Sequence, residues 1–260
     1  MDASRIEQVL AAAGLAAETP SVVIDHGKSG DLVARCGEAF VKLARRAEAW
    51  NVQTLARETD VLLWLAGKAP VPAVLWSGDC GEDLALVMAA APGAPVSHVA
   101  EDQAEAALTA ALKTLAALHA LPLGDCPFDQ RLAVKLAQAE ARLTTGLVDE
   151  TDFDGQRLGL TAAEVWAQLK PMIPAGEDLV LTHGDASLPN FIWDGGAGTT
   201  LIDLGRFGVA DRHQDLALFL RSAKRNHPQV DAVGLLQAHY PLAALDEARL
   251  AFYRLLDEFF

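Results

Sequence analysis

The sequence predicts an α+β fold with two lobes, a small sheet-rich N-terminal lobe followed by a larger helical lobe. The first third of the chain alternates short apolar segments with turn residues, as short strands do. The remainder is dominated by apolar residues at helical spacing. A connection rich in breakers, Ala89-Ala90-Ala91-Pro92-Gly93, separates the two patterns. We therefore expect an N-terminal lobe at residues 1–90 and a C-terminal lobe at residues 91–260.

Local patterns predict the individual elements in chain order. Strands are expected at residues 21–25, 32–36, 39–43, 74–77 and 84–88, with Gly27, Gly30 and Gly37 in the turns. A helix is expected at residues 52–65, where leucines recur on one face. In the second lobe, helices are expected at residues 101–120, 131–144, 161–169, 211–225, 231–239 and 246–260.

Composition excludes several classes of protein. An apolar content of 51% indicates a globular chain, and no apolar run is long enough to span a bilayer. The N-terminus shows no secretory signal, and the three widely spaced cysteines favour a reducing cytoplasm. A net charge of −14 disfavours nucleic-acid phosphate as a partner. We therefore expect a cytoplasmic protein with neither a nucleic-acid nor a membrane partner.

The strongest motif combines two carboxylates and one amide at fixed spacing. Asp185 follows His-Gly, Asn190 stands five residues later, and Asp203 opens Asp-Leu-Gly thirteen residues further on. In protein kinases, Asp-x-x-x-x-Asn supplies the catalytic aspartate and a magnesium-binding asparagine, and a later Asp-Phe-Gly supplies the main metal ligand. Leu204 stands in place of that phenylalanine. The motif predicts phosphoryl transfer from a nucleotide, and the two-lobed layout is that of a protein-kinase-like fold.

The residue types fit this chemistry. Magnesium prefers hard oxygen ligands, which Asn190 and Asp203 can supply. Asp185 would accept a hydrogen bond from the attacking hydroxyl, orient it, and take up its proton late, because an aspartate is a poor base for an alcohol. His183 is interpreted as a residue that braces the loop rather than as a proton shuttle.

The N-terminal lobe offers candidates for the nucleotide side. Lys42 lies within an apolar strand, and Glu58 on the following helix is its natural ion-pair partner, since an unpaired buried ammonium is costly. Paired in this way, Lys42 could reach nucleotide phosphates; the alternative is an edge residue that faces solvent. The turn that contains Ser29 could cover the phosphates, and Ser29 could equally be a plain turn residue.

These residues carry a family resemblance. The chain resembles the aminoglycoside 3'-phosphotransferases, antibiotic-resistance kinases of the neomycin/kanamycin type, most densely at residues 181–190, 202–215 and 251–260. The resemblance implies a protein-kinase-like fold, ATP with Mg²⁺, and phosphorylation of an aminoglycoside hydroxyl, the 3'-OH, giving resistance. It implies these roles: catalysis by Asp185, magnesium binding by Asn190 and Asp203, a phosphate-side ion pair of Lys42 and Glu58, adenine reading by the backbone of Met88, Ala89 and Ala91, and bracing of the loop by Asp215.

Aminoglycosides are polycations, so the resemblance also implies a carboxylate-rich acceptor site. The residues that it places there are Asp152 and Asp154 from an acidic loop, Asp257, Glu258 and the carboxylate of Phe260 from the tail, and Arg206 and Arg221, which would organise the carboxylates. The acidic run could also be no more than a solvated loop.

The chain departs from the family pattern at this acceptor site. Gly155 and Gln156 stand where relatives show acids, and Lys224 and Arg225 lie in a stretch where relatives carry acids. These departures leave open a second hypothesis, a kinase of another small hydroxylated metabolite on the same fold. A non-catalytic pseudokinase would be supported by loss of Lys42 or of any of the three motif residues, and all are present.

Overall fold

A computed structural model describes residues 2–15, 22–24, 32–242 and 244–260 of the chain. The chain divides into two compact units, the first comprising Met1–Gly93 and Thr200–Gly205, the second Ala94–Thr199 and Arg206–Phe260. Both units combine strands and helices, as the α+β prediction requires. None of the helices formed by the described residues has the length and apolarity that a membrane crossing needs.

The first unit contains a five-stranded antiparallel sheet in the order β1-β2-β3-β5-β4. Its strands are β1 (Val22–Ile24), β2 (Leu32–Cys36), β3 (Ala39–Arg45), β4 (Val74–Cys80) and β5 (Asp83–Ala89). The short β9 (Thr200–Leu201) belongs to the same unit. Gly37 turns the chain between β2 and β3 with a φ of 57°, a conformation that glycine adopts without a steric penalty.

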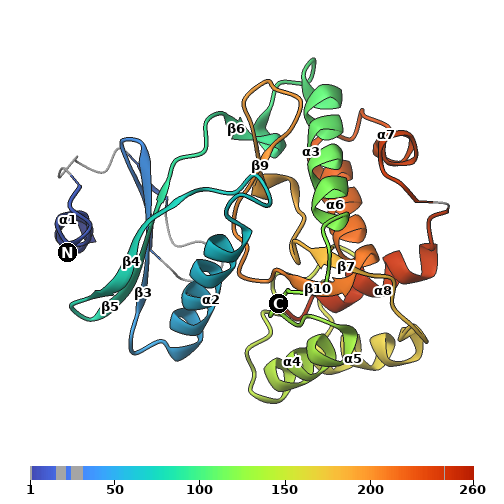
Figure 1. The fold of residues 1–260 in the computed structure, drawn as a ribbon. Helices are drawn as coiled ribbons and strands as arrows, with labels where there is room; N and C mark the ends of the chain where they lie inside the picture. The colour runs from blue at the N-terminus through green and yellow to red at the C-terminus, as the bar shows by residue number, and fades with distance from the viewer. Residues whose placement is uncertain (1, 16–21, 25–31, 243) are drawn as a thin grey trace. The chain divides into compact units, whose positions relative to one another are not determined.

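Two helices cover opposite faces of this sheet, α1 (Asp2–Ala12) and α2 (Ala49–Leu65) (Figure 1). The sequence analysis missed α1, although Ile6, Val9 and Leu10 recur at helical spacing and are all buried. They pack against alternate residues of the strands, which form one hydrophobic cluster with them.

The alternation of β3 determines which side chain faces which helix. Val41 and Leu43 belong to the cluster that contains α1, so Lys42 between them points to the opposite face. That face carries α2, whose buried residues include Leu55 and Glu58. A lysine and a glutamate are therefore brought together inside the unit by strand and helix periodicity alone.

The second unit is mainly helical. Its helices are α3 (Ala104–His119), α4 (Leu132–Thr144), α5 (Ala162–Leu169), α6 (Arg212–Asn226), α7 (Ala232–His239) and α8 (Glu247–Asp257). Three 3₁₀ turns accompany them, η1 (Val96–His98), η2 (Lys170–Met172) and η3 (Leu188–Asn190). Every helix and strand predicted within the described residues is present, with ends within three residues of the expected ones.

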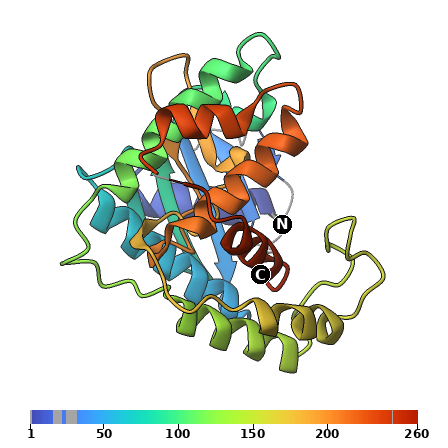
Figure 2. The same ribbon diagram turned by 90° about the vertical axis from the view of Figure 1, so that its right-hand side faces the viewer.

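Short strands that the sequence analysis missed position the key loop. β7 (Leu179–Thr182) pairs antiparallel with β10 (Gly208–Asp211), and β6 (Ala94–Pro95) pairs with β8 (Phe191–Trp193). The loop with Asp185 follows β7 directly, and α6 begins directly after β10. Figures 1 and 2 both show α6 beside α8. The helix that follows β10 therefore also contacts the C-terminal helix.

Candidate active site

The first unit holds a lysine between two carboxylates. Lys42 Nζ lies 2.8 Å from both carboxylate oxygens of Glu58 and 3.3 Å from Asp203 Oδ1. Burial lowers the pKa of Lys42, but the charges of Asp203 and Glu58 outweigh it and raise the pKa above the usual value. The predicted Lys42–Glu58 ion pair is present. It keeps the Lys42 ammonium charged and in position to bind an anionic group.

Asp203 has an unusual backbone. It is the only non-glycine residue in the described ranges with a positive φ, at 59°, a region that aspartate visits more readily than most residues. Its side chain is 58% exposed, whereas the next residue, Leu204, is fully buried. Arg57 Nε donates to the carbonyl oxygen of Gly205 at 3.1 Å and holds the following turn. The Asp-Leu-Gly segment is therefore a constrained turn that presents a carboxylate.

In the second unit, a buried aspartate braces the loop before Asp185. Asp215 on α6 is fully buried. Its carboxylate accepts hydrogen bonds from the backbone N–H groups of His183, at 2.6 Å, and Gly184, at 2.9 Å. His119 Nε2 lies 2.9 Å from the same carboxylate. Because hydrogen bonds to an ionised acceptor are strong, α6 fixes this loop as expected.

Asp185 and Asn190 are linked within the braced loop. Asn190 Nδ2 donates to the backbone carbonyl oxygen of Asp185 at 2.9 Å. The backbone N–H of Asp185 donates to His183 Nδ1 at 3.3 Å, and the ring of His183 is buried and stacked on Phe191. These contacts agree with a bracing role for His183. The Asp185 side chain is only partly buried, so it remains accessible to a ligand.

Gly184 allows the loop to approach the segment that begins with Arg206. Its φ is 87°, and a Cβ at this position would lie 2.0 Å from the backbone oxygen of Arg206. Only glycine fits such a contact. Gln214 on α6 adds a hydrogen bond from Nε2 to the carbonyl oxygen of Gly184 at 2.8 Å. Packing therefore requires the glycine of the His-Gly-Asp sequence.

Two arginines clamp Asp257 at the end of α8. Arg206 Nη1 donates to Asp257 Oδ1 at 3.1 Å, and Arg221 Nη2 donates to Asp257 Oδ2. Burial lowers the pKa of Arg221, but the nearby charges of Asp257, Glu258 and Asp185 outweigh it and raise that pKa. Arg221 therefore connects the tail electrostatically with the Asp185 loop.

Glu258, which was expected to face a ligand, is buried. Its side chain is 4% exposed, and Oε2 accepts the backbone N–H of Asp154 at 3.0 Å. Oε1 lies 3.8 Å from Arg221 Nη1 and 4.0 Å from Arg157 Nη1. Burial, together with the charge of Asp154, raises the pKa of Glu258 to about 7 against the opposing effects of the hydrogen bond from the Asp154 backbone and of the two arginines.

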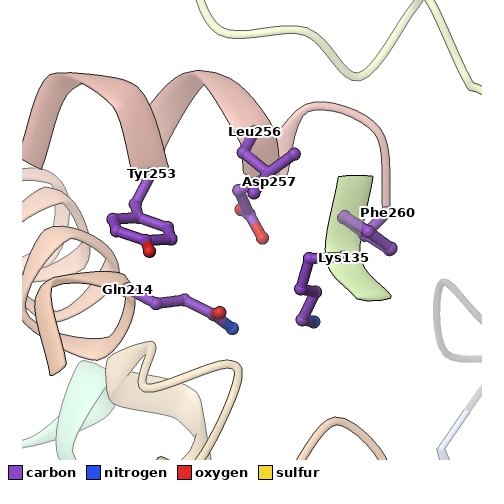
Figure 3. Close-up of a pocket in the computed structure, with 6 residues that line it drawn as sticks. All are labelled: Lys135, Gln214, Tyr253, Leu256, Asp257 and Phe260. Atoms are coloured by element: carbon purple, nitrogen blue, oxygen red, sulfur yellow. The ribbon is translucent and has the colours of Figure 1, made fainter. Parts of the chain in front are cut away.

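Phe260 lines a small pocket among α4, α6 and α8 (Figure 3). Its ring centroid lies 4.6 Å from Lys135 Nζ and 5.3 Å from Arg206 Cζ, within cation–π range. Gln214 and Tyr253 line the pocket with Lys135, and Figure 3 shows these side chains reaching toward one space. The end of the tail therefore packs against Lys135 of α4 and against Arg206.

The remaining predicted site residues lie as follows. Met88 and Ala89 end β5, where the N–H of Ala89 donates to the carbonyl oxygen of Ala73 at 2.9 Å. This leaves the carbonyl of Ala89 and the backbone of Ala91 as candidates for the expected adenine contact. Asp152 is exposed in the turn before Asp154. Ser29 lies outside the described residues.

Lys224 and Arg225, the added cations of the sequence analysis, are exposed in the last turn of α6. Cations at this position complement the partial negative charge of a helix C-terminus. Their placement agrees with a solvated helix end.

Two cations near the tail were missed by sequence reasoning. Lys135 had a detectable signal, because it shares the buried stripe of α4 with Leu132 and Ala139 at helical spacing. Arg157 pairs with Asp154 three residues earlier in the same loop, but its contact with Glu258 arises only from packing of the loop against the tail, which no local pattern predicts. Among the described residues, no group of three or more His, Cys, Asp and Glu side chains is arranged to hold a metal ion.

Comparisons with known proteins agree with this geometry. Residues 11–253 match the model of the phosphotransferase enzyme family, APH. An aminoglycoside 3'-phosphotransferase from Escherichia coli is 37% identical over 90% of this chain and 88% of its own. The crystal structure of an aminoglycoside 3'-phosphotransferase of type VIII shares 38% identity and a TM-score of 0.82, covering 92% of this chain and 93% of its own.

A more distant solved structure is that of APH(3'')-Id from Streptomyces rimosus in complex with ADP and streptomycin, at 26% identity and a TM-score of 0.83. It covers 98% of this chain and 97% of its own. These similarities extend over nearly the whole chain, and the chain shares the protein-kinase-like fold of the related structures. The chain belongs to the phosphotransferase enzyme family that includes the aminoglycoside 3'-phosphotransferases.

Proposed function

We propose that this protein transfers the γ-phosphoryl group of ATP to a hydroxyl of an aminoglycoside antibiotic, the 3'-hydroxyl, and so confers resistance. The observation that carries the proposal is the Asp185–Asn190 loop, held by the buried carboxylate of Asp215 in the second unit. Relatives with 37% identity over most of the chain are aminoglycoside 3'-phosphotransferases, which supports the acceptor and the position. A related structure with bound ADP supports the nucleotide.

Asp185 acts on the acceptor. Its carboxylate accepts a hydrogen bond from the attacking hydroxyl, holds the oxygen in line, and takes up the proton as the new ester bond forms. The loop needs rigidity for this task because misplacement of a reacting group by a single ångström is costly in rate. The hydrogen bonds from His183 and Gly184 to Asp215 supply that rigidity.

Lys42 acts on the nucleotide. Its ammonium is kept charged and oriented by Glu58 and Asp203, so it can bind phosphate oxygens without first reorganising. The backbone of Ala89 and Ala91 would read the adenine, and Ser29 would lie over the phosphates.

The donor set fits magnesium. Asp203 presents an exposed carboxylate. Asn190 can supply its side-chain amide oxygen, while its Nδ2 donates to the carbonyl oxygen of Asp185. Mg²⁺ favours a few protein oxygens together with water and phosphate oxygens. When bound, the ion neutralises charge on the phosphates.

Carboxylates on the second unit would bind acceptor ammonium groups. We assign this role to Asp152, Asp154 and Asp257, together with Phe260, with Arg206 and Arg221 setting the position of Asp257. Glu258, expected from the sequence to join them, has a buried side chain and instead holds the backbone N–H of Asp154. Because several of these carboxylates are paired with arginines, a second candidate remains, a kinase of a less cationic hydroxylated compound. The three widely spaced cysteines favour a cytoplasmic site of action, where ATP is available.

A coupled assay of ADP release tests the proposal. We expect ADP formation to depend on an added aminoglycoside and to be lost in Asp185→Asn, whereas Asp125→Asn, an exposed aspartate of the same unit, should retain it. Turnover with other small alcohols but with no aminoglycoside would favour the second candidate.

A further inference from the structure

Arg157 contacts two carboxylates near the tail. Its Nη1 donates to Asp154 Oδ2 and lies 4.0 Å from Glu258 Oε1. Both carboxylates belong to the group that the family resemblance assigned to binding acceptor ammonium groups. The Arg157 side chain is only 17% exposed, so the guanidinium is part of the packed structure and not a solvated side chain over it.

Both carboxylate oxygens of Glu258 face other groups of the protein. Oε1 has no hydrogen-bond partner among the described residues, and its nearest cations are the guanidinium groups of Arg157 and Arg221. Oε2 is occupied by the backbone N–H of Asp154. Burial raises the pKa of this carboxyl to about 7, which further reduces its negative charge at neutral pH. Glu258 therefore offers little attraction to an ammonium.

A guanidinium stays protonated throughout the working range of proteins. An acceptor ammonium that approaches Asp154 or Glu258 must either displace Arg157 or remain beside a fixed positive charge. A hydroxyl meets no such repulsion and can donate to the exposed part of Asp154.

We propose that Arg157 is a specificity-determining residue that occupies an ammonium position of the acceptor site, so that this enzyme favours aminoglycosides bearing a neutral hydroxyl there over those bearing an amino group. This inference rests on the proposed function, since it assumes that an aminoglycoside is the acceptor. It assigns Arg157 no part in the chemical step.

Steady-state kinetics on matched acceptors test the proposal. Neomycin and paromomycin, which differ by a hydroxyl in place of an amino group, form one such pair, and further pairs that exchange these groups elsewhere complete the panel. In Arg157→Gln, KM for the amino member of at least one pair should fall by about tenfold relative to its hydroxyl partner, as expected for removal of a cation about 4 Å away. The value of kcat should stay near that of the wild type.

Two variants control for local disruption. Arg157→Lys retains the positive charge and should keep the wild-type ratio of KM values. Arg131→Gln removes an arginine from an exposed pair with Asp129 in the same unit and should also keep it. The same assays at high salt should shrink the difference between Arg157→Gln and the wild type, because partly exposed charges are screened.

The outcomes separate the two claims. Equal changes in KM for both members of every pair would overturn the role of Arg157 while leaving the proposed function intact. An unchanged ratio in Arg157→Gln with normal folding would do the same. Failure of every protein, the wild type included, to phosphorylate any aminoglycoside would overturn the proposed function and this inference with it.

Discussion

Asp185 and Asp215 belong to the same unit and have the same side chain, but their surroundings give them different tasks. Asp215 is fully buried, and its carboxylate is used by two backbone N–H groups and by His119. Asp185 lies in the loop held by those bonds, and its side chain remains partly accessible. At the scale of single residues, burial decides which carboxylate stabilises the structure and which can meet a substrate.

Asp185→Asn should lower kcat by about 10²-fold or more, as for loss of a positioned acid–base group, with little change in the Kd for ATP. Asparagine has nearly the same size and preserves the backbone contacts of the loop. Turnover and nucleotide titration measured on the same sample check this expectation. Turnover close to that of the wild type would remove Asp185 from the catalytic role.

Asp203→Ala should raise the Mg²⁺ concentration needed for half-maximal activity by on the order of tenfold or more, because loss of a ligand should cost at least as much as loss of a supporting contact. Binding of ATP should weaken together with the metal. Lys42 keeps its pair with Glu58, so the fold of the first unit should survive. A magnesium titration that matches the wild type would show that Asp203 is not a ligand.

Glu258→Gln should change how stability depends on pH. The carboxyl has a pKa of about 7 in the folded protein, against an ordinary value of 4.5. Between these values the folded state holds a proton that the unfolded state has released, so this group's contribution to stability falls as pH rises. The free energy of unfolding of the variant, relative to the wild type, should therefore increase from about pH 4.5 to about pH 7 and then level off.

Urea denaturation of both proteins across this pH range measures that difference. A difference that stays constant with pH would mean that Glu258 does not titrate in the window. A difference that decreases would mean that the hydrogen bond from the Asp154 backbone and the arginines together lower its pKa more than burial raises it.

At the scale of elements, the brace between α6 and the Asp185 loop is the feature that makes the site. The loop follows β7, α6 follows β10, and the ladder between the two strands sets their separation. Four backbone pairs, from Gly208↔Thr182 to Asp211↔Leu179, are enough to place Asp215 beneath His183. The helix and the ladder act together, because neither would position the loop alone.

Asp215→Asn should lower the free energy of unfolding by about 3 kcal/mol, since a buried charged acceptor with several donors is lost. It should also lower kcat, because the loop loses its fixed geometry. Asp231→Ala provides a comparison in the same unit; it removes an N-cap of α7 and should cost about 1 kcal/mol without a change in kcat. If the two variants behave alike, the contact of Asp215 with the loop has no special role.

Long helices of the second unit can be predicted from the sequence, whereas its four-residue strands cannot, for a physical reason. Helices such as α3 and α6 repeat their apolar stripe over several turns, so the pattern is visible without the fold. β7 and β10 span four residues each, and their pairing joins positions far apart in the chain. A run that short is compatible with loop or strand until its partner is known.

The same contrast holds for the site. Asp185, Asn190 and Asp203 could be found because their roles depend on spacing along the chain, and Lys42 with Glu58 because strand and helix periodicity make them meet. Their roles in the reaction remain predictions. Arg157 depends on contact between a loop and a tail about a hundred residues later, which no local pattern encodes.

At the scale of the whole molecule, the residues of the proposed chemistry are divided between the two units. The first holds Lys42, Glu58 and Asp203, and the second holds Asp185, Asn190 and the tail. The net charge of −14 would attract cationic acceptors over longer distances, so association should weaken with salt.

Identification of the product tests the central claim most directly. The protein would be incubated with ATP, Mg²⁺ and either kanamycin B or its 3'-deoxy analogue, and the drug examined by ³¹P NMR and mass spectrometry. We expect a phosphomonoester on the 3'-oxygen of kanamycin B and no phosphorylated product from the analogue. Equal phosphorylation of both drugs, or ADP release with no phosphorylated drug, would contradict the assignment.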